Sequence, residues 1–248
     1  MRAVWQICRD VLLEARRNQL FLLTLGLSFC LILLFTAISH ADESLRSRLF
    51  SEISMTLLWV MHFILAVFLV TESLYTDVKD KSIYFYLVRN VSRQQYLLGK
   101  YLGFLLAISG SVLASGSIVL LCSTWLNSSL DVKLIWGLWF LICEMALILS
   151  VLTLLSFMFS KLITVFLFLF LFFFASFIEY LSIDSGLHGG LKVLLFLAPN
   201  FKYYSYMEMI VHAKAISYKY ILFLLGYTGC MSLFYLISTS LQFRSREL

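Results

Sequence analysis

Charge is scarce in this chain, and proline is almost absent. Only 13% of its 248 residues are Asp, Glu, Lys or Arg, the one proline is Pro199, and 61% are hydrophobic. A soluble core of this size cannot absorb so much apolar surface. The net charge of +5 comes without a basic cluster long enough to bind a phosphate backbone, so we expect no nucleic-acid partner.

Motifs for metal binding, nucleotide binding and common catalytic sites are also missing. The five cysteines form no C-x-x-C pair, which argues against a zinc site or a disulfide framework. The chain has no G-x-x-x-x-G-K-[ST] loop, because Gln94 stands where Gly99-Lys100 would need the first glycine. It also has neither H-E-x-x-H nor G-x-S-x-G. We therefore expect a chain that is not an enzyme and binds no cofactor or metal itself.

Six long apolar runs separated by short charged segments are the main positive feature. A bilayer core of about 30 Å needs roughly 20 apolar helical residues, and lipid leaves the backbone no other hydrogen-bonding choice than helix. The sequence predicts an all-α integral membrane protein, with residues 1–248 forming one domain. The predicted spans are approximately 18–41, 53–72, 100–124, 134–159, 162–181 and 219–242.

Residues 1–17 form a charged leader with the pattern of an amphipathic helix. Apolar residues recur at helical spacing on one face: Val4, Ile7, Cys8, Val11, Leu12 and Ala15. We expect an elbow helix that lies in the headgroup plane before the first span. The alternative is an ordinary charged anchor.

An even number of spans places both termini on the same side of the membrane. With that side cytoplasmic, the inner segments carry twelve Lys and Arg residues and the outer segments seven. The positive-inside rule therefore predicts cytoplasmic termini in a multi-pass protein of the cell (inner) membrane.

The third predicted span begins with a row of small residues four positions apart. Gly99, Gly103, Ala107 and Ser111 follow this spacing, which allows two helices to approach closely in lipid. The row predicts either a contact with a second copy or helix packing within one chain.

Residues 182–218 are predicted to be extracytoplasmic. An apolar run too short to cross the membrane precedes Pro199, and aromatic residues follow it. This pattern indicates a short outer helical segment that is interfacial or re-entrant. A lid or a simple connection would show the same pattern.

Residues 73–99 are the most charged part of the chain and yet contain an apolar core around Ile83–Val88. Ser92 and Gln95 have capping-box spacing, so a helix should begin near Arg93. A charged cytoplasmic segment with an apolar core is typical of a site that binds a protein partner.

This segment resembles the hallmark stretch of ABC-2 type exporter permeases, the six-span transmembrane subunits of ABC transporters. The similarity is carried by Asp77, Lys81-Ser82-Ile83, Leu87, Val91-Ser92-Arg93 and the run Tyr96–Gly103, with its Leu-Gly-Lys entry into a span. The ending Phe243–Leu248 is similar to a Phe-x-Arg-Arg-Asp-Leu ending common in that family. Asn90 stands where the family often has proline, and Ser82 where threonine is usual.

The resemblance implies a transport subunit that dimerises with itself or a paralogue and works with a cytosolic ABC ATPase, which would bind ATP and Mg. Residues 73–99 would be the coupling segment, or coupling helix, of the permease, aided by the leader. The residues implied in ATPase coupling are Asp77, Lys81, Ile83, Phe85, Leu87, Arg89 and Arg93. The few charges in the spans favour a lipid-like, amphipathic or peptide substrate.

Two polar residues lie within predicted spans. Glu144 is costly at mid-bilayer, so it is either a pathway or coupling residue or a buried hydrogen-bonding group that contacts Ser150 or another helix. His62 could contact a substrate or metal, but no second ligand stands at suitable spacing, which favours a core or interface position.

Two other classes of protein remain as alternatives. A secondary transporter or channel often shows repeated, Gly/Pro-interrupted half-helices, and this chain shows no such repeat. An integral membrane enzyme would need clustered catalytic groups or ligands. An adjacent gene for a Walker-type ATPase would separate the exporter from both.

Overall fold

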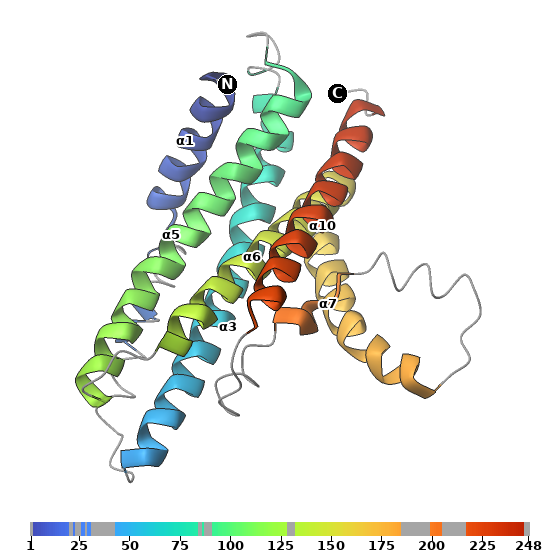
Figure 1. Ribbon diagram of the computed structural model, residues 1–248. Coiled ribbons are helices and arrows are strands. Elements are labelled where there is room, and N and C mark those ends of the chain that lie inside the picture. The colour runs from blue at the N-terminus through green and yellow to red at the C-terminus, as the bar shows by residue number, and fades with distance from the viewer. Residues whose placement is uncertain are drawn as a thin grey trace.

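A computed structural model shows an elongated bundle of helices (Figure 1). It describes residues 2–19, 22, 26–27, 29–30, 43–83, 86, 91–127, 132–184, 199–204 and 217–245, and the side chains of these except in 43–48, 126–127, 176–184 and 244–245. Its elements are α1 (Arg2–Arg17), α3 (Glu43–Lys79), α5 (Arg93–Asn127), α6 (Val132–Met158), α7 (Lys161–Asp184), the 3₁₀ helix η1 (Phe201–Tyr204) and α10 (Tyr218–Ser245). The predicted all-helical class is confirmed for these residues. Most of the predicted span 18–41 lies outside them.

Four of the described helices are long and apolar enough to cross a membrane, which supports a membrane protein. They are Leu49–Lys79 within α3, Arg93–Trp125 within α5, the whole of α6, and Tyr218–Phe243 within α10. Three of them contain a predicted span, and α6 covers the span 134–159 up to Met158, one residue short of its predicted end. Helix α7 covers the predicted span 162–181. The apolar part of α7 whose side chains are described, Lys161–Ala175, is shorter than the four helices that are long enough to cross a membrane.

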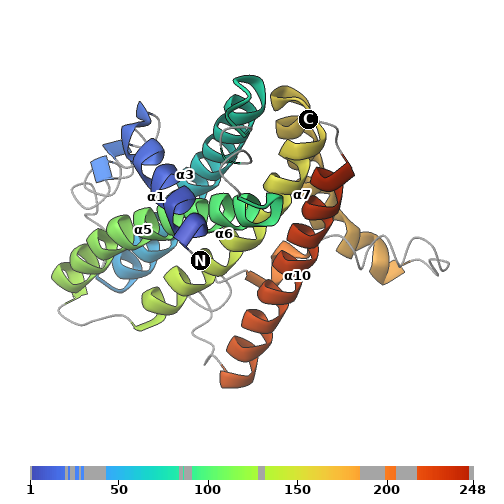
Figure 2. The same cartoon turned by 90° about the horizontal axis from the view of Figure 1, so that it is seen from above.

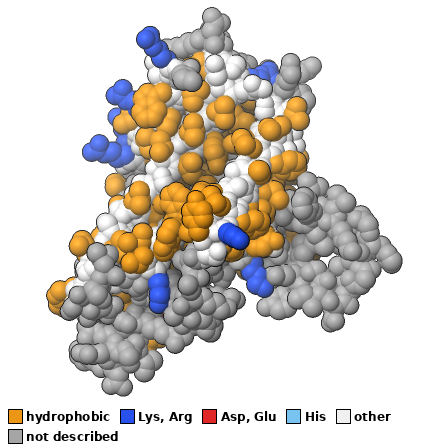
Figure 3. Space-filling model, viewed as in Figure 1, with side chains coloured by type: hydrophobic (Ala, Val, Ile, Leu, Met, Phe, Trp, Pro, Cys, Tyr) orange, Lys and Arg blue, Asp and Glu red, His pale blue; other side chains and the backbone are white. Residues whose placement is uncertain are grey.

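Helix α6 is the centre of the bundle. It packs against α3, α5, α7 and α10, whereas α1 packs on α5 (Figures 1 and 2). In the most apolar stretch of 18 residues in each helix, 83% of the α6 residues are buried inside the bundle but only 28% of the α10 residues. The outer helices therefore keep apolar faces that only lipid or another apolar surface can cover, and hydrophobic side chains spread over the visible face in Figure 3.

Helices α3 and α5 are longer than the predicted spans. Helix α3 has 37 residues and α5 has 35, so each is more than 50 Å long at about 1.5 Å per residue, against a bilayer core of about 30 Å. The predicted coupling segment 73–99 is correspondingly not one separate loop. Its first residues continue α3 to Lys79, its last residues begin α5 at Arg93, and the connection between them is residues 80–92.

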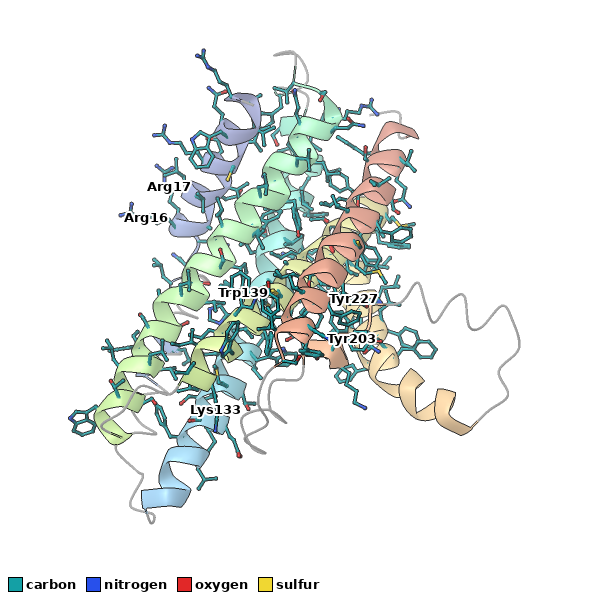
Figure 4. All side chains as sticks on the ribbon, viewed as in Figure 1. Arg16, Arg17, Lys133, Trp139, Tyr203 and Tyr227 are labelled. Carbon is teal, nitrogen blue, oxygen red and sulfur yellow. The ribbon has the colours of Figure 1, made fainter. Side chains whose placement is uncertain are left out.

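Most of the predicted extracytoplasmic segment 182–218 lies outside the described residues. Its described middle part contains η1, which packs on α6 and α7. The Phe201 ring packs at a tilt against Phe172 with ring centroids 4.9 Å apart, and the Asn200 backbone N–H donates to the Tyr227 hydroxyl over 2.8 Å. This short helix is therefore held against the bundle beside the first part of α10, where Tyr203 of η1 lies close to Tyr227 of α10 (Figure 4).

Candidate functional site

Helix α1 lies directly against the start of α5, where two glycines allow the contact. Its buried residues are Ile7, Cys8, Val11 and Ala15, four of the six apolar residues that the helical spacing singled out. A Cβ added to Gly99 would lie 2.8 Å from the Ile7 Cβ, and one added to Gly103 would lie 2.6 Å from the Val11 Cβ. The contact moves from Ile7 to Val11 on α1 as it moves from Gly99 to Gly103 on α5, so the two helices run in the same direction, as Figure 1 shows.

This contact uses the row of small residues for packing within the chain. Gly99 and Gly103 receive α1, and Ala107 and Ser111, further along the row, are also buried. Of the two predicted uses of the row, the structure places intrachain packing at its glycines.

Lys100, next to Gly99, is the centre of a buried polar network between α1, α3 and α5. Its side chain is only 5% exposed. The ammonium lies 2.7 Å from the Asp77 Oδ2 and 3.5 Å from the Glu14 Oε2, and it donates to the Ser73 Oγ over 2.9 Å. Ser73 in turn donates to the Glu14 Oε2 over 2.9 Å. One lysine thus joins the leader helix to the end of α3.

Asp77 accepts two more hydrogen bonds in this network. The Tyr96 hydroxyl donates to the Asp77 Oδ2, and the Ser82 hydroxyl donates to the Oδ1 over 2.8 Å. Ser82 follows a turn in which Lys81 adopts a left-handed φ of 55°. A residue in this conformation commonly ends a helix, so the turn stops α3 and returns the chain toward Asp77.

Tyr86 extends the network toward the surface of α1. Its hydroxyl donates to the Asp10 Oδ2 over 3.3 Å, and its ring packs on Tyr96 with centroids 5.6 Å apart. Burial, followed by the nearby charges of Asp10 and Asp77, raises the pKa of Tyr86 to about 12. The phenol therefore stays a neutral donor across the physiological pH range.

The predicted capping box at the start of α5 is confirmed. The Ser92 N–H donates to the Gln95 Oε1 over 3.1 Å, and the Gln95 N–H donates to the Ser92 Oγ over 3.2 Å. Arg93 then reaches the other end of the chain, where it donates to the Phe243 carbonyl over 2.6 Å and lies over the Phe243 ring at 5.4 Å. The beginning of α5 is thereby tied to the end of α10.

Of the residues predicted for ATPase coupling, the four that the structure describes do not all lie on an exposed surface. Asp77 is part of the network, Arg93 binds Phe243, and Ile83 is only 1% exposed. Lys81 is exposed on the turn after α3. Phe85, Leu87 and Arg89 lie outside the described residues.

Glu72, near the end of α3, forms an ion pair with Lys161 at the start of α7. Lys79 and Lys81 stand closer to it in the sequence, but its partner follows 89 residues later. Both side chains are partly exposed, so this pair belongs to the same polar end of the bundle as Lys100.

Glu144 is buried at the centre of the bundle, away from the Lys100 network. Its carboxyl accepts a hydrogen bond from the Trp59 side chain of α3 and lies near Tyr204 of η1. Ser150, the partner considered from sequence, instead donates to the Leu147 carbonyl over 2.7 Å. A contact with another helix is thus the arrangement found.

His62 lies in the packed interface between α3 and α5. It is 2% exposed, with its Nδ1 2.7 Å from the Leu58 carbonyl and its ring beside the backbone of Ser111. Within the described part of the chain, no three His, Cys, Asp or Glu side chains are grouped as metal ligands. The core position favoured by the sequence agrees with this placement.

Lys100 is the functional candidate that the sequence analysis did not single out. In the sequence it stands out only through the Leu-Gly-Lys similarity and as one of the twelve basic residues of the inner segments. A signal existed, because a lysine at the start of a long charge-free run must either reach water or find buried carboxylates. Its partners Glu14 and Asp77 lie on two other helices, so their meeting could not be read from spacing.

Comparisons with known proteins do not assign the chain to a family. No protein-family model matches it. No curated protein matches it either.

Proposed function

We propose that this chain is the permease subunit of an ATP-driven exporter of the ABC-2 type. In this proposal six spans cross the inner membrane with both termini in the cytoplasm. Helix α1 is the elbow helix that precedes them, but it runs alongside the start of α5 instead of in the headgroup plane. Two copies, or one copy and a paralogue, enclose a pathway for a lipid-like, amphipathic or peptide substrate. A separate cytosolic ABC ATPase binds and hydrolyses ATP.

The Lys100 network is the observation that carries the proposal. The sequence segment that resembles an exporter coupling segment meets the leader helix through Lys100, Asp77 and Glu14. Tyr96 and Ser82 fix Asp77 from two further positions. Such a junction suits a segment that receives a displacement from a partner and passes it to long helices.

The mechanism follows from how firmly these parts are joined. A push on the turn near Lys81 would move the end of α3 together with Asp77. Lys100 would carry the movement to α5 and α1, because separating its charge from a buried carboxylate costs several kcal/mol. The arginine contact with Phe243 would bring α10 into the same rigid body. Alternating access would then result from rigid-body motion of spans.

The sharpest test uses Lys81 and not Asp77, because Asp77 also holds the fold together. We expect Lys81→Glu, at the exposed turn, to weaken co-purification with a Walker-motif ATPase from native membranes. Lys219→Glu, an exposed lysine at the start of α10 on the proposed outer side, is the matched control and should leave it unchanged. Equal recovery of the ATPase with both variants would contradict the docking role of the turn.

A transport assay separates the exporter from a secondary transporter or channel. In proteoliposomes that contain the chain and its ATPase, transport should require ATP and stop with vanadate. Substrate movement by the purified chain alone under an ion gradient would overturn the proposal.

A further inference from the structure

A groove on the surface of α1 has the charges of a site for a zwitterionic lipid headgroup. Its volume is about 510 Å³, and the lining residues described are Asp10, Leu13, Glu14, Arg17 and Asn18. We propose that it binds an aminophospholipid such as phosphatidylethanolamine, whose headgroup carries a primary ammonium and a phosphate. This inference requires a membrane location but does not depend on the exporter proposal.

The level of the groove is fixed by the chain that follows it. Asn18, which lines the groove, is also the first residue of a 24-residue run without Asp, Glu, Lys or Arg that ends at Ala41. Such a run enters the hydrocarbon at its start, so Asn18 belongs near the headgroups. The exposed side chain of Leu13 offers an apolar surface between the charged groups.

The order of charges along the helix matches the order of charges in the lipid. Arg17 lies nearest the hydrocarbon, where the lipid phosphate is attached to glycerol. Helix α1 runs parallel to the start of α5 and not in the headgroup plane. Glu14 therefore lies about 4.5 Å further out and Asp10 about 10 Å further out, from a rise of 1.5 Å per residue. The ammonium, at the outer end of the headgroup, would therefore meet the carboxylates while the phosphate meets Arg17.

The acidic groups of the groove retain capacity for this contact. The network uses one oxygen of each carboxylate: Asp10 Oδ2 accepts from Tyr86, and Glu14 Oε2 accepts from Ser73 and lies beside Lys100. The Glu14 side chain remains 44% exposed. Arg17 is the last residue of α1, and its side chain points away from the bundle (Figure 4).

An anionic lipid suits this groove less well than a zwitterionic one. Its phosphate would also find Arg17, but its headgroup would place no positive charge beside Asp10 and Glu14. Phosphatidylcholine supplies a positive charge but cannot donate a hydrogen bond, because its ammonium is fully methylated. The groove should therefore prefer phosphatidylethanolamine to both phosphatidylcholine and phosphatidylglycerol.

Native mass spectrometry of the full chain, titrated with equimolar lipid pairs, tests this order. We expect phosphatidylethanolamine to be retained about three- to fivefold better than phosphatidylcholine, as for one half-exposed charge contact. Asp10→Asn should bring this ratio close to one, whereas Asp80→Asn, at an exposed position beyond α3, should not change it. Arg17→Gln should weaken both lipids, and the adjacent Arg16→Gln, outside the groove lining, should not.

Three results would overturn the inference. They are equal retention of the two lipids by the wild-type chain, a ratio unchanged in Asp10→Asn, and a preference for phosphatidylglycerol. The last would assign lipid binding to the exposed arginines of α1 and not to the groove. A thermal melt of each variant in detergent identifies any that has lost its fold, and for such a variant Asp10→Ser provides the replacement measurement of the same ratio.

Discussion

Replacing Lys100 with methionine should release α1 from the bundle, because this lysine holds the leader through buried charge. Methionine keeps most of the apolar stem but removes the ammonium that lies between Asp77, Ser73 and Glu14. Breaking a buried ion pair by removing one partner costs about 3–5 kcal/mol. Asp77 keeps its bonds from Tyr96 and Ser82, and the Glu14 side chain is 44% exposed, so we expect a loss below that range, roughly 2–3 kcal/mol.

The thiol of Cys8 reports this release directly. Cys8 is buried against the bundle, 2% exposed, on the face of α1 that packs on α5. Burial raises the pKa of the Cys8 thiol, so docking suppresses both its access and its thiolate form. A loss of 2–3 kcal/mol in docking should accelerate alkylation by a water-soluble maleimide by roughly 30-fold or more. Peptide mapping distinguishes Cys8 from the other cysteines.

A double variant tests whether charge, and not volume, is responsible. Lys100→Met/Asp77→Asn removes the unpaired carboxylate together with the ammonium. Its fold-acceleration of Cys8 labelling over the wild type should therefore be smaller than the product of the accelerations in the two single variants. Lys133→Met, at the start of α6, controls for the loss of one lysine elsewhere. A Cys8 labelling rate in Lys100→Met equal to that of the wild type would refute the reasoning.

Three further changes test the same junction. Gly99→Ala should weaken α1 docking by about 1–3 kcal/mol because the new Cβ meets Ile7, whereas Gly110→Ala on the same helix has open space and should be neutral or stabilising in thermal melts. Tyr86→Phe should lower the free energy of unfolding by about 1 kcal/mol, because it removes the hydrogen bond to Asp10. Since the pKa of Tyr86 is raised to about 12 in the folded protein, this hydrogen bond stabilises the wild type fully below about pH 10 and is lost as the pH passes about 12. Absorbance titration of the phenol at alkaline pH measures this loss. Ser92→Ala should cost about 1 kcal/mol of stability by removing the α5 cap, and Ser92→Thr should retain most of it.

The sequence predicted the features that depend on local spacing. The buried face of α1 follows from a 3.6-residue period, and the cap of α5 follows from Ser92 and Gln95 standing three residues apart. Both need only neighbouring residues. The helix ends were less accurate, because hydropathy marks where a helix is apolar and not where it stops, so α3 and α5 extend well beyond their predicted spans.

Contacts between distant segments could not be predicted in the same way. The row of small residues from Gly99 indicates that some helix approaches closely, but it does not say which helix. Glu72 has two lysines within ten residues and yet pairs with Lys161. In each case the partner is chosen by the fold of the whole bundle, which a single sequence does not contain.

Gly99 and Lys100 are neighbours with complementary tasks, and this explains why the junction needs both. Apolar packing between helices gives little net stabilisation where lipid can replace the partner, so close approach at Gly99 alone would hold α1 weakly. Lys100 supplies a partner for Glu14 and Asp77 that lipid cannot offer. A glycine that admits the leader, followed at once by a lysine that binds it, makes α1 part of the bundle. A movement of residues 73–83 must then move α1 and α5 together, or else leave a charge buried without a partner.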